Sequence, residues 1–209
     1  MFDHAFQDFV TLLAVYNPTG IVPQYLFFTR RASPEVRKKL ALRSVAIATA
    51  ILVAFIVLGQ ILLEALQISL PSFSIAGGLV LLIISLRTIF EGVHDDLAEE
   101  EEKEASLASA RDLAVFPLAT PLIAGPRGIL VVVLLTDNHR FGAPEQAVTT
   151  LMLLVVLGFT FLVLRAAETV QRVLGVTGIN VVSRVSGLVL AALAVETILD
   201  GIRTSFSLI

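Results

Sequence analysis

The sequence predicts an all-α membrane protein with six transmembrane helices. The chain is 56% hydrophobic and only 16% charged, whereas soluble domains average roughly 45–50% apolar and about 25% charged residues. Its hydrophobic residues form runs long enough to cross a bilayer, which takes about 20 residues. The order of interrupted and continuous runs also recurs along the chain, which indicates an internal repeat.

Six candidate spans follow from the hydrophobic runs. The second, third and sixth are continuous, whereas proline and glycine interrupt the first and fourth. The helix of the second span is expected to begin at Ser33-Pro34-Glu35, because serine is a favoured N-cap and proline suits the first helical position. The spans cover residues 5–29, 42–64, 72–92, 112–136, 146–170 and 181–202.

Basic residues predict the side of the membrane on which each loop lies. Residues 30–43 contain six Lys or Arg and a single acid, so this loop is expected in the cytoplasm. Alternation then places loops 93–111 and 171–180 inside and both termini outside.

The chain has no Cys, which excludes disulfides and thiolate metal sites. Its net charge of −3 gives no nucleic-acid footprint.

The chain contains two copies of a three-span unit. Residues 74–92 and 183–201 lie 109 positions apart and are identical at eight of 19 positions. Pro18-Thr-Gly-Ile also aligns with Pro126-Arg-Gly-Ile. A unit with an odd number of spans makes its second copy enter the membrane from the opposite side. The halves are therefore predicted to form an inverted repeat, as in many secondary transporters.

The repeat divides the chain into two membrane units and a linker. Each unit carries a Ser-xxx-Gly motif, which favours close helix packing and alternatively a moving gate interface. The acidic stretch of the linker is expected to be a solvated connection, with cation sensing or partner binding as the alternative. The three parts are residues 1–93, 94–111 and 112–209.

The two interrupted spans are predicted to start new half-helices at membrane depth. Asparagine is a favoured N-cap and proline a favoured first residue, so half-helices are expected from Pro18 to about Thr29 and from Pro126 to about Thr136. The N–H groups at such starts attract anions, and inversion would bring the two starts together at a substrate site. Proline kinks with structural roles alone are the alternative.

Two charged residues are candidates for function. Arg127 follows Pro126 at a depth where an unpaired charge costs several kcal/mol. Its guanidinium would bind a carboxylate or phosphate, or else pair with backbone carbonyls or reach water. Glu196, near a span end, is a candidate proton or ion site. The candidate substrate-binding residues are Asn17, Thr19, Gly20, Thr120, Gly125, Arg127 and Gly128, and we expect no catalytic or metal-binding residue.

These motifs resemble those of the MarC-related membrane proteins, also classed as six-span neutral amino acid transporters. The resemblance rests on residues 17–23, 74–78 and 117–126 and covers nearly the whole chain. It implies a multi-pass protein of the prokaryotic cytoplasmic (inner) membrane and a small neutral amino acid as substrate. Arg127 stands where the family pattern has a small residue, and its side chain would either fill the site or change it toward a more anionic substrate.

The sequence therefore predicts a secondary transporter, or exporter, of small neutral amino acids or related small carboxylates by alternating access. We expect a small-molecule substrate, the lipid bilayer and no nucleic acid as partners, and the sequence leaves a homo-oligomer open. No cofactor is expected, although Na⁺ or H⁺ would couple transport. The alternatives are a translocase of a phosphate-bearing lipid headgroup and a non-transporting scaffold or sensor, and an enzyme is not expected.

Overall fold

The computed structural model describes residues 2–29, 32–90, 113–137 and 141–206, and every regular element in these ranges is a helix. The acidic linker at 94–111 lies outside the described residues. The helices are α1 (Phe2–Tyr16), α2 (Val22–Phe28), α3 (Pro34–Ala65), α4 (Leu70–Phe90), the π-helical η1 (Ala114–Ile123), α7 (Pro126–Leu135), α8 (Ala143–Arg165) and α9 (Ala167–Ser205).

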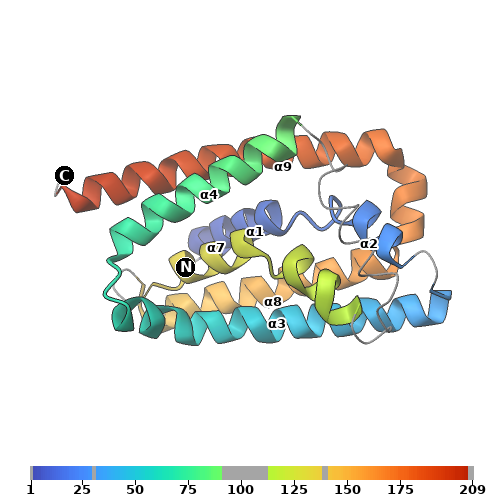
Figure 1. Cartoon of the computed structure of the whole chain (residues 1–209), viewed down its shortest axis with the longest axis horizontal. Helices are drawn as coiled ribbons and strands as arrows, with labels where there is room; N and C mark the ends of the chain where they lie inside the picture. Colours follow the sequence, from blue (N-terminus) through green and yellow to red (C-terminus); the bar gives the residue numbers. More distant parts are fainter. Residues whose placement is uncertain (1, 30–31, 91–112, 138–140, 207–209) are drawn as a thin grey trace.

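The long helices enclose the interrupted ones (Figure 1). Helices α3 and α8 lie side by side along one edge of the molecule, and α4 and α9 lie side by side along the other. Between them, α1 packs on α8 and η1 packs on α3. This arrangement suits interrupted helices, because non-helical backbone is tolerated at membrane depth only where protein or a water-filled cavity covers it.

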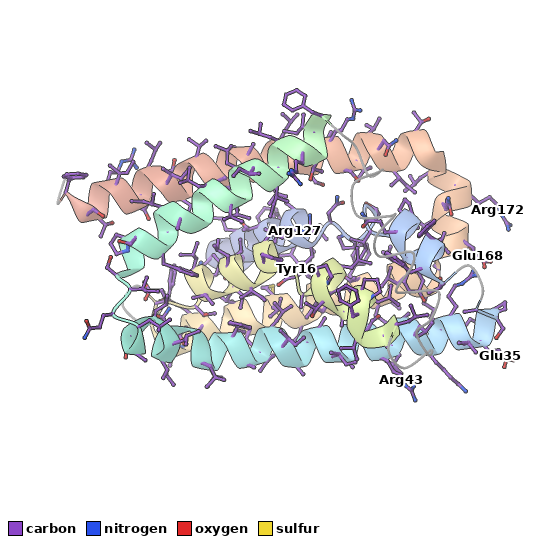
Figure 2. All side chains as sticks on the ribbon, in the orientation of Figure 1. Tyr16, Glu35, Arg43, Arg127, Glu168 and Arg172 are labelled. Atoms are coloured by element: carbon purple, nitrogen blue, oxygen red, sulfur yellow. The ribbon has the colours of Figure 1, made fainter. Side chains whose placement is uncertain are left out.

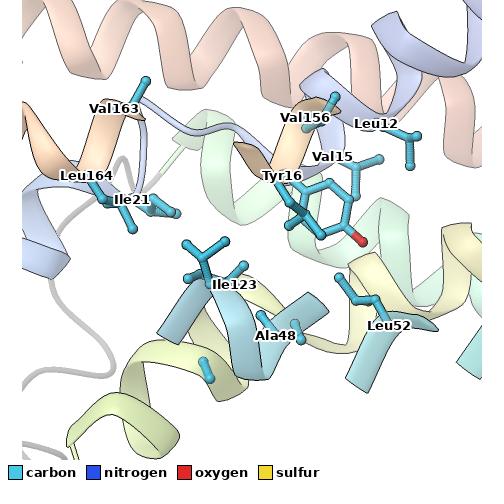
Figure 3. Packing of buried hydrophobic residues seen from close by; sticks show 14 of the residues in the cluster. Leu12, Val15, Tyr16, Ile21, Ala48, Leu52, Ile123, Val156, Val163 and Leu164 are labelled. Atoms are coloured by element: carbon cyan, nitrogen blue, oxygen red, sulfur yellow. The ribbon is translucent and has the colours of Figure 1, made fainter. Parts of the chain in front are cut away.

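Apolar side chains fill the space between these helices (Figure 3). Leu12 and Val15 of α1, Leu52 of α3 and Val156 of α8 have no exposed surface. In a bilayer the lipid tails are as apolar as leucine, so helix association depends on van der Waals packing rather than on removal from water. The fit of these side chains therefore matters more than their hydrophobicity.

Large apolar side chains also cover the outer faces of the long helices. Four large side chains on the outer face of α3 are each at least half exposed, namely those of Val57, Leu58, Ile61 and Leu62. Soluble proteins rarely expose contiguous apolar surface of this kind. Helices α3, α4, α8 and α9 are long and apolar enough to cross a membrane. The number of candidate spans is 5 if η1 and α7 together form one broken span.

The helix starts and ends confirm one expectation and correct another. The start of α3 is confirmed, because the Ser33 hydroxyl accepts the N–H of Val36 at 3.4 Å. The first span consists of two short helices, α1 with 15 residues and α2 with 7, and it is not among the candidate crossings, so it stays a prediction. Residues 171–180, expected as a loop, belong to α9, whose two helical parts meet at a kink at Gly175. Gly175 has a φ of 64°, which glycine adopts without strain.

Helices α4 and α9 pack closely through glycines. A Cβ added to Gly78 would lie 2.5 Å from Ile198 Cγ1 and 2.9 Å from the carbonyl oxygen of Ala194. A Cβ added to Gly187 would lie 2.9 Å from Ile89 Cγ1 and 3.3 Å from the carbonyl oxygen of Ser85. Adding 109 to the numbers of Gly78, Ser85 and Ile89 gives Gly187, Ala194 and Ile198. The two sets of contacts are therefore equivalent, and each half presents the same surface to the other.

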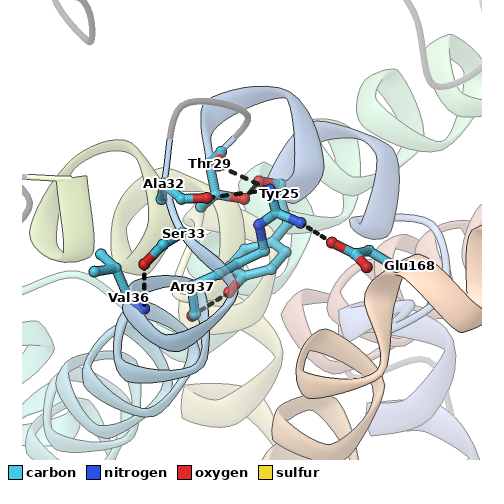
Figure 4. A network of polar contacts seen from close by, with 7 residues as sticks. All are labelled: Tyr25, Thr29, Ala32, Ser33, Val36, Arg37 and Glu168. Carbon is cyan, nitrogen blue, oxygen red and sulfur yellow. Dashed lines mark hydrogen bonds and ion pairs between the residues drawn. The ribbon is translucent and has the colours of Figure 1, made fainter.

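A polar network joins α2, α3 and α9 at one end of the molecule (Figure 4). The Arg37 guanidinium pairs with Glu168 and donates to the carbonyl of Thr29 at 3.2 Å. The Tyr25 hydroxyl donates to the carbonyl of Arg37 at 2.6 Å. Arg37 therefore adds a charged donor to the carbonyl of Thr29, which also accepts the N–H of Ala32 at 2.9 Å.

A second polar contact joins α1 to α8. The Thr149 hydroxyl donates to the Asp8 carboxylate at 2.6 Å, and both residues are buried. His4 Nδ1 lies 3.7 Å from the same carboxylate, and the His4 ring stacks on Phe141. Because a buried carboxylate is costly without partners, these groups hold the start of α1 against α8.

Candidate functional site

The first interruption begins where α1 ends at Tyr16. Asn17 follows with a φ of 42°, in the left-handed region that asparagine tolerates better than most residues. Its N–H donates to the carbonyl of Leu13 at 2.9 Å, and its side-chain oxygen accepts the N–H of Gly20 at 3.2 Å. Asn17 therefore ends α1 rather than starting the next helix.

The prediction that the first half-helix starts at Pro18 is wrong. Helix α2 begins at Val22, and the residues before it form a turn. Two N–H groups of this turn have acceptors, since Gly20 donates to the carbonyl of Asn17 and Val22 to that of Thr19. The first interruption therefore lacks the helix start at Pro18 that was expected to attract an anion.

The second interruption matches the prediction more closely. Helix α7 begins at Pro126 with Gly125 as its N-cap and ends at Leu135. A side chain on Gly125 would overlap the carbonyl of Pro121, so this position has room only for glycine. The axes of η1 and α7 meet at 56°. The Thr120 hydroxyl, in a non-helical part of η1, is buried and has no hydrogen-bond partner among the described residues.

The two interruptions meet where Tyr16 contacts the first turn of α7. The Tyr16 hydroxyl donates to the carbonyl of Gly128 at 3.4 Å. A Cβ on Gly128 would lie 2.8 Å from the tyrosine ring, so the close approach depends on glycine. Figure 2 places Arg127 beside Tyr16 in the interior of the molecule. The end of the first broken helix therefore lies against the start of the second.

Arg127 brings a positive charge to this contact. Its side chain is half-buried, and no hydrogen bond or ion pair joins its guanidinium to another of the described residues. As the second residue of α7, it also contributes an N–H group that has no acceptor within the helix. A guanidinium and the positive end of a helix together favour a carboxylate or a phosphate at this point.

The predicted site residues divide between the two interruptions. Thr19 donates to the Asn17 side chain at 3.5 Å and lies with Gly20 at the first. Thr120, Gly125, Arg127 and Gly128 lie at or next to the second. Glu196 is not part of either group, because its side chain is 66% exposed and lies 3.4 Å from Arg203. It is therefore placed outside the proposed site.

Sequence reasoning missed two residues of this region. Tyr16 supplies the contact between the interruptions, and only the three-dimensional arrangement identifies it. Ser183 of α9 is fully buried beside the first interruption, and its hydroxyl would lie 2.7 Å from a Cβ on Gly20. The repeat marks Ser183 as the counterpart of Ser74, but the Ser-xxx-Gly motif predicts only close helix packing or a gate interface.

Comparison with known proteins identifies the family. A model of the MarC family of integral membrane proteins matches residues 2–206. The chain belongs to the MarC family. This assignment confirms the resemblance found in the motifs at 17–23, 74–78 and 117–126.

Curated relatives match over nearly their whole lengths. A UPF0056 membrane protein of Methanocaldococcus jannaschii is 37% identical over 196 residues, which are 93% of this chain and 94% of that protein. The UPF0056 inner membrane protein YhgN of Escherichia coli is 29% identical over 195 residues, or 93% of each chain. Their names give a membrane location and no substrate. No solved structure is significantly similar to this chain.

The comparisons and the helices together establish a multi-pass integral membrane protein. Family membership extends over nearly all of the chain, and at least four of its helices have the length and composition of membrane spans. The name of the Escherichia coli relative places that protein in the inner membrane. The MarC-family relatives carry no enzyme names.

Proposed function

We propose that this MarC-family protein is a secondary transporter of small neutral amino acids or related small carboxylates, working by alternating access. The observation that carries the proposal is the contact between the two interruptions, where Tyr16 meets Gly128 beside Arg127. Substrates of secondary transporters bind where discontinuous helices of the two repeats meet near the middle of the membrane. In this chain, Arg127 and the start of α7 would hold the carboxylate.

The reciprocal glycine contacts of α4 and α9 support the inverted repeat that alternating access needs. An interface formed by the same patch on both partners has two-fold symmetry, and the contacts of Gly78 and Gly187 correspond under the shift of 109 residues. The packing of η1 on α3 likewise corresponds to that of α1 on α8. On this basis we propose six spans in two inverted units, residues 1–93 and 112–209, with both termini outside.

The substrate class follows from the charges at the site. Arg127 is the charged group beside the meeting point, and its guanidinium matches a carboxylate in shape and charge. The buried hydroxyl of Thr120 and the Asn17 amide add neutral hydrogen-bonding groups. A small carboxylate that also carries polar groups would satisfy these residues. The same guanidinium would bind a phosphate, which is the basis of the lipid-headgroup alternative.

Counterflow in liposomes tests the proposal. The purified protein would be reconstituted, loaded with unlabelled alanine, glycine, serine or glutamate, and supplied with the labelled compound outside, with and without Na⁺ and pH gradients. We expect saturable exchange of at least one neutral amino acid. Arg127→Ala should abolish this exchange, because the carboxylate loses its charged partner, whereas Arg87→Ala, on the exposed last turn of α4, should retain it.

Two outcomes would contradict the proposal. Exchange that is unchanged in Arg127→Ala would remove Arg127 from the site. Absence of exchange for all four compounds, together with movement of a fluorescent phospholipid headgroup across the same vesicles, would favour the lipid translocase. Loss of exchange in both arginine variants would indicate damage to the fold rather than to the site.

A further inference from the structure

A cavity of about 110 Å³ lies between the start of α3 and the junction of α8 with α9. Its lining includes three cationic side chains, those of Arg37, Lys38 and Arg165, and one acidic side chain, that of Glu168. Glu168 pairs with Arg37 (Figure 4), so the lining keeps the two positive charges of Lys38 and Arg165. Arg127 is not among the lining residues, and the cavity is therefore separate from the proposed transport site.

The polar groups of this lining are only partly satisfied. Lys38 and Arg165 are exposed, and neither has a hydrogen bond or an ion pair with another of the described residues. The Nε group of Arg37 is buried and has no acceptor in the part of the chain that the structure describes. A buried donor without a partner calls for an explanation. An anion in the cavity would pair with the two free cations.

The start of α9 adds backbone donors to the same lining. Its N-cap residue, Ala166, makes no side-chain cap, and the N–H of Val170 donates to the carbonyl of Ala166 at 2.9 Å. The N–H groups of the three residues before Val170 have no acceptor within α9. These residues, Ala167, Glu168 and Thr169, all line the cavity. Open N–H groups at a helix start favour anions such as phosphate.

Both long helices place the cavity at the level of the lipid headgroups. On α3, the first exposed large apolar side chain is that of Leu42, at 58%, and Lys38 lies about 6 Å before it along the helix. On α8, the last exposed large apolar side chain is that of Leu162, at 57%, and Arg165 lies about 4.5 Å beyond it. The headgroup layer is roughly 5–8 Å thick on each side of the hydrocarbon core. Lys38 and Arg165 therefore lie where the phosphates of a bilayer are found.

We propose that this cavity binds the phosphate of an anionic phospholipid headgroup. Basic cavities between membrane helices are suited to such headgroups. The depth of Lys38 and Arg165 favours a lipid over a phosphate ion from solution, and their unpaired charges favour an anionic headgroup over a zwitterionic one. With the proposed orientation, the lipid belongs to the cytoplasmic leaflet. Once bound, it would connect the start of α3 to the start of α9, beside the contact of Arg37 with Glu168.

Native mass spectrometry of the purified chain in detergent tests the site. The protein would be titrated with phosphatidylglycerol and, separately, with phosphatidylcholine of the same acyl chains, and the dissociation constant of the first bound lipid measured. We expect phosphatidylglycerol to bind at least about tenfold more tightly, because a hydrogen bond to a charged group contributes roughly this factor. Changing Lys38→Gln and Arg165→Gln together should remove this preference.

A matched double variant separates a built site from general attraction to negative charge. Lys39 and Arg43 are exposed cations of the same helix α3 and do not line the cavity. Changing Lys39→Gln and Arg43→Gln together alters the net charge by the same amount and should keep the preference for phosphatidylglycerol within about twofold of the wild type. Because all four side chains are exposed, both double variants should elute as the wild type does in size-exclusion chromatography.

Three outcomes would overturn the proposal. Equal affinity of the wild type for the two lipids would show that the cavity does not select an anionic headgroup. Equal loss of the preference in both double variants would show attraction to the whole basic end of α3 rather than binding in the cavity. Displacement of phosphatidylglycerol by equimolar inorganic phosphate at constant ionic strength would assign the cavity to a soluble anion instead. None of these results bears on transport at Arg127, which the counterflow assay tests separately.

Discussion

A graded series of glycine-to-alanine variants should measure how closely α4 and α9 pack. In Gly78→Ala the new methyl group would lie 2.9 Å from the backbone oxygen of Ala194, which cannot rotate away, so the helices must separate. Overpacking of this kind costs about 1–3 kcal/mol, and the helical preference of alanine over glycine returns about 1 kcal/mol. The expected net loss of unfolding free energy is about 0–2 kcal/mol.

Two further glycines set the scale for this loss. Gly187→Ala meets a flexible side chain first, at 2.9 Å, and backbone only at 3.3 Å, so its net effect should be close to zero. Gly158→Ala is the control, because no atom lies within 4 Å of the added Cβ. It should gain the helical preference, up to about 1 kcal/mol.

Thermal unfolding of the three variants in one detergent would check the order. A change of 1 kcal/mol shifts the Tm of a chain of this size by roughly 2–4 °C. We expect Gly158→Ala to unfold at the highest temperature, Gly187→Ala near the wild type and Gly78→Ala at the lowest. If Gly78→Ala were as stable as Gly158→Ala, the close contact between α4 and α9 would not exist as described.

Five other variants test three local contacts by the same unfolding measurement. Thr149→Val should cost about 1–3 kcal/mol, because the buried Asp8 carboxylate loses its donor, and an unchanged Tm would contradict their contact. Arg37→Ala should cost about 1–3 kcal/mol, because the carbonyls of Thr29 and Ala32 lose a charged donor, whereas Glu168→Gln, whose side chain is 60% exposed, should cost less than about 1 kcal/mol; the reverse order would refute this assignment. Asn17→Ala should cost about 1–2 kcal/mol through its cap and its positive φ, and Asn17→Gly less, since glycine retains the backbone conformation.

Features that depend on local sequence could be predicted well. Long apolar runs exist because a span must remove its backbone from lipid by forming a helix, so composition alone located the long helices. The starts at Ser33 and Pro126 follow from the preferences of serine and proline for the beginning of a helix. These features need no information about distant parts of the chain.

The start of α2 could not be predicted, because asparagine has two opposite local roles. It favours the residue before a helix, and it also tolerates the left-handed backbone that ends one. At Asn17 the second role prevails, since its φ is 42° and its side chain bonds to Gly20. The fold also places Gly20 of the same turn next to Ser183 of α9, and such a tertiary contact lies outside any local rule.

Two other residues of the site, Ser183 and Tyr16, could not be predicted because their contacts are also tertiary. Ser183 lies more than 160 positions from Gly20, and Tyr16 lies more than 110 from Gly128. Their importance comes from close approach across the repeat. Glu196 lies apart from both interruptions, with a side chain that is 66% exposed, and its role as a proton or ion site stays a prediction.

The unequal contacts of the two repeat-related glycines suggest how the protein would change its access. In an inverted-repeat transporter, exchanging the conformations of the two halves opens the site to the other side of the membrane. In this structure Gly78 is the more tightly packed of the pair, at 2.5 and 2.9 Å against 2.9 and 3.3 Å for Gly187. After the exchange, Gly187 would be the tighter contact.

A methyl group at each glycine should therefore shift access in opposite directions. Gly78→Ala disfavours the state described here, and Gly187→Ala disfavours the exchanged state. The chain has no Cys, so a single cysteine placed at Thr19 would report access to the first interruption through its reaction with an impermeant maleimide. We expect one glycine variant to label faster than the parent from outside and the other to label more slowly, with the order reversed in inverted vesicles. Shifts in the same direction would refute the exchange of the two halves, because a general loosening of the α4–α9 contact cannot favour opposite sides.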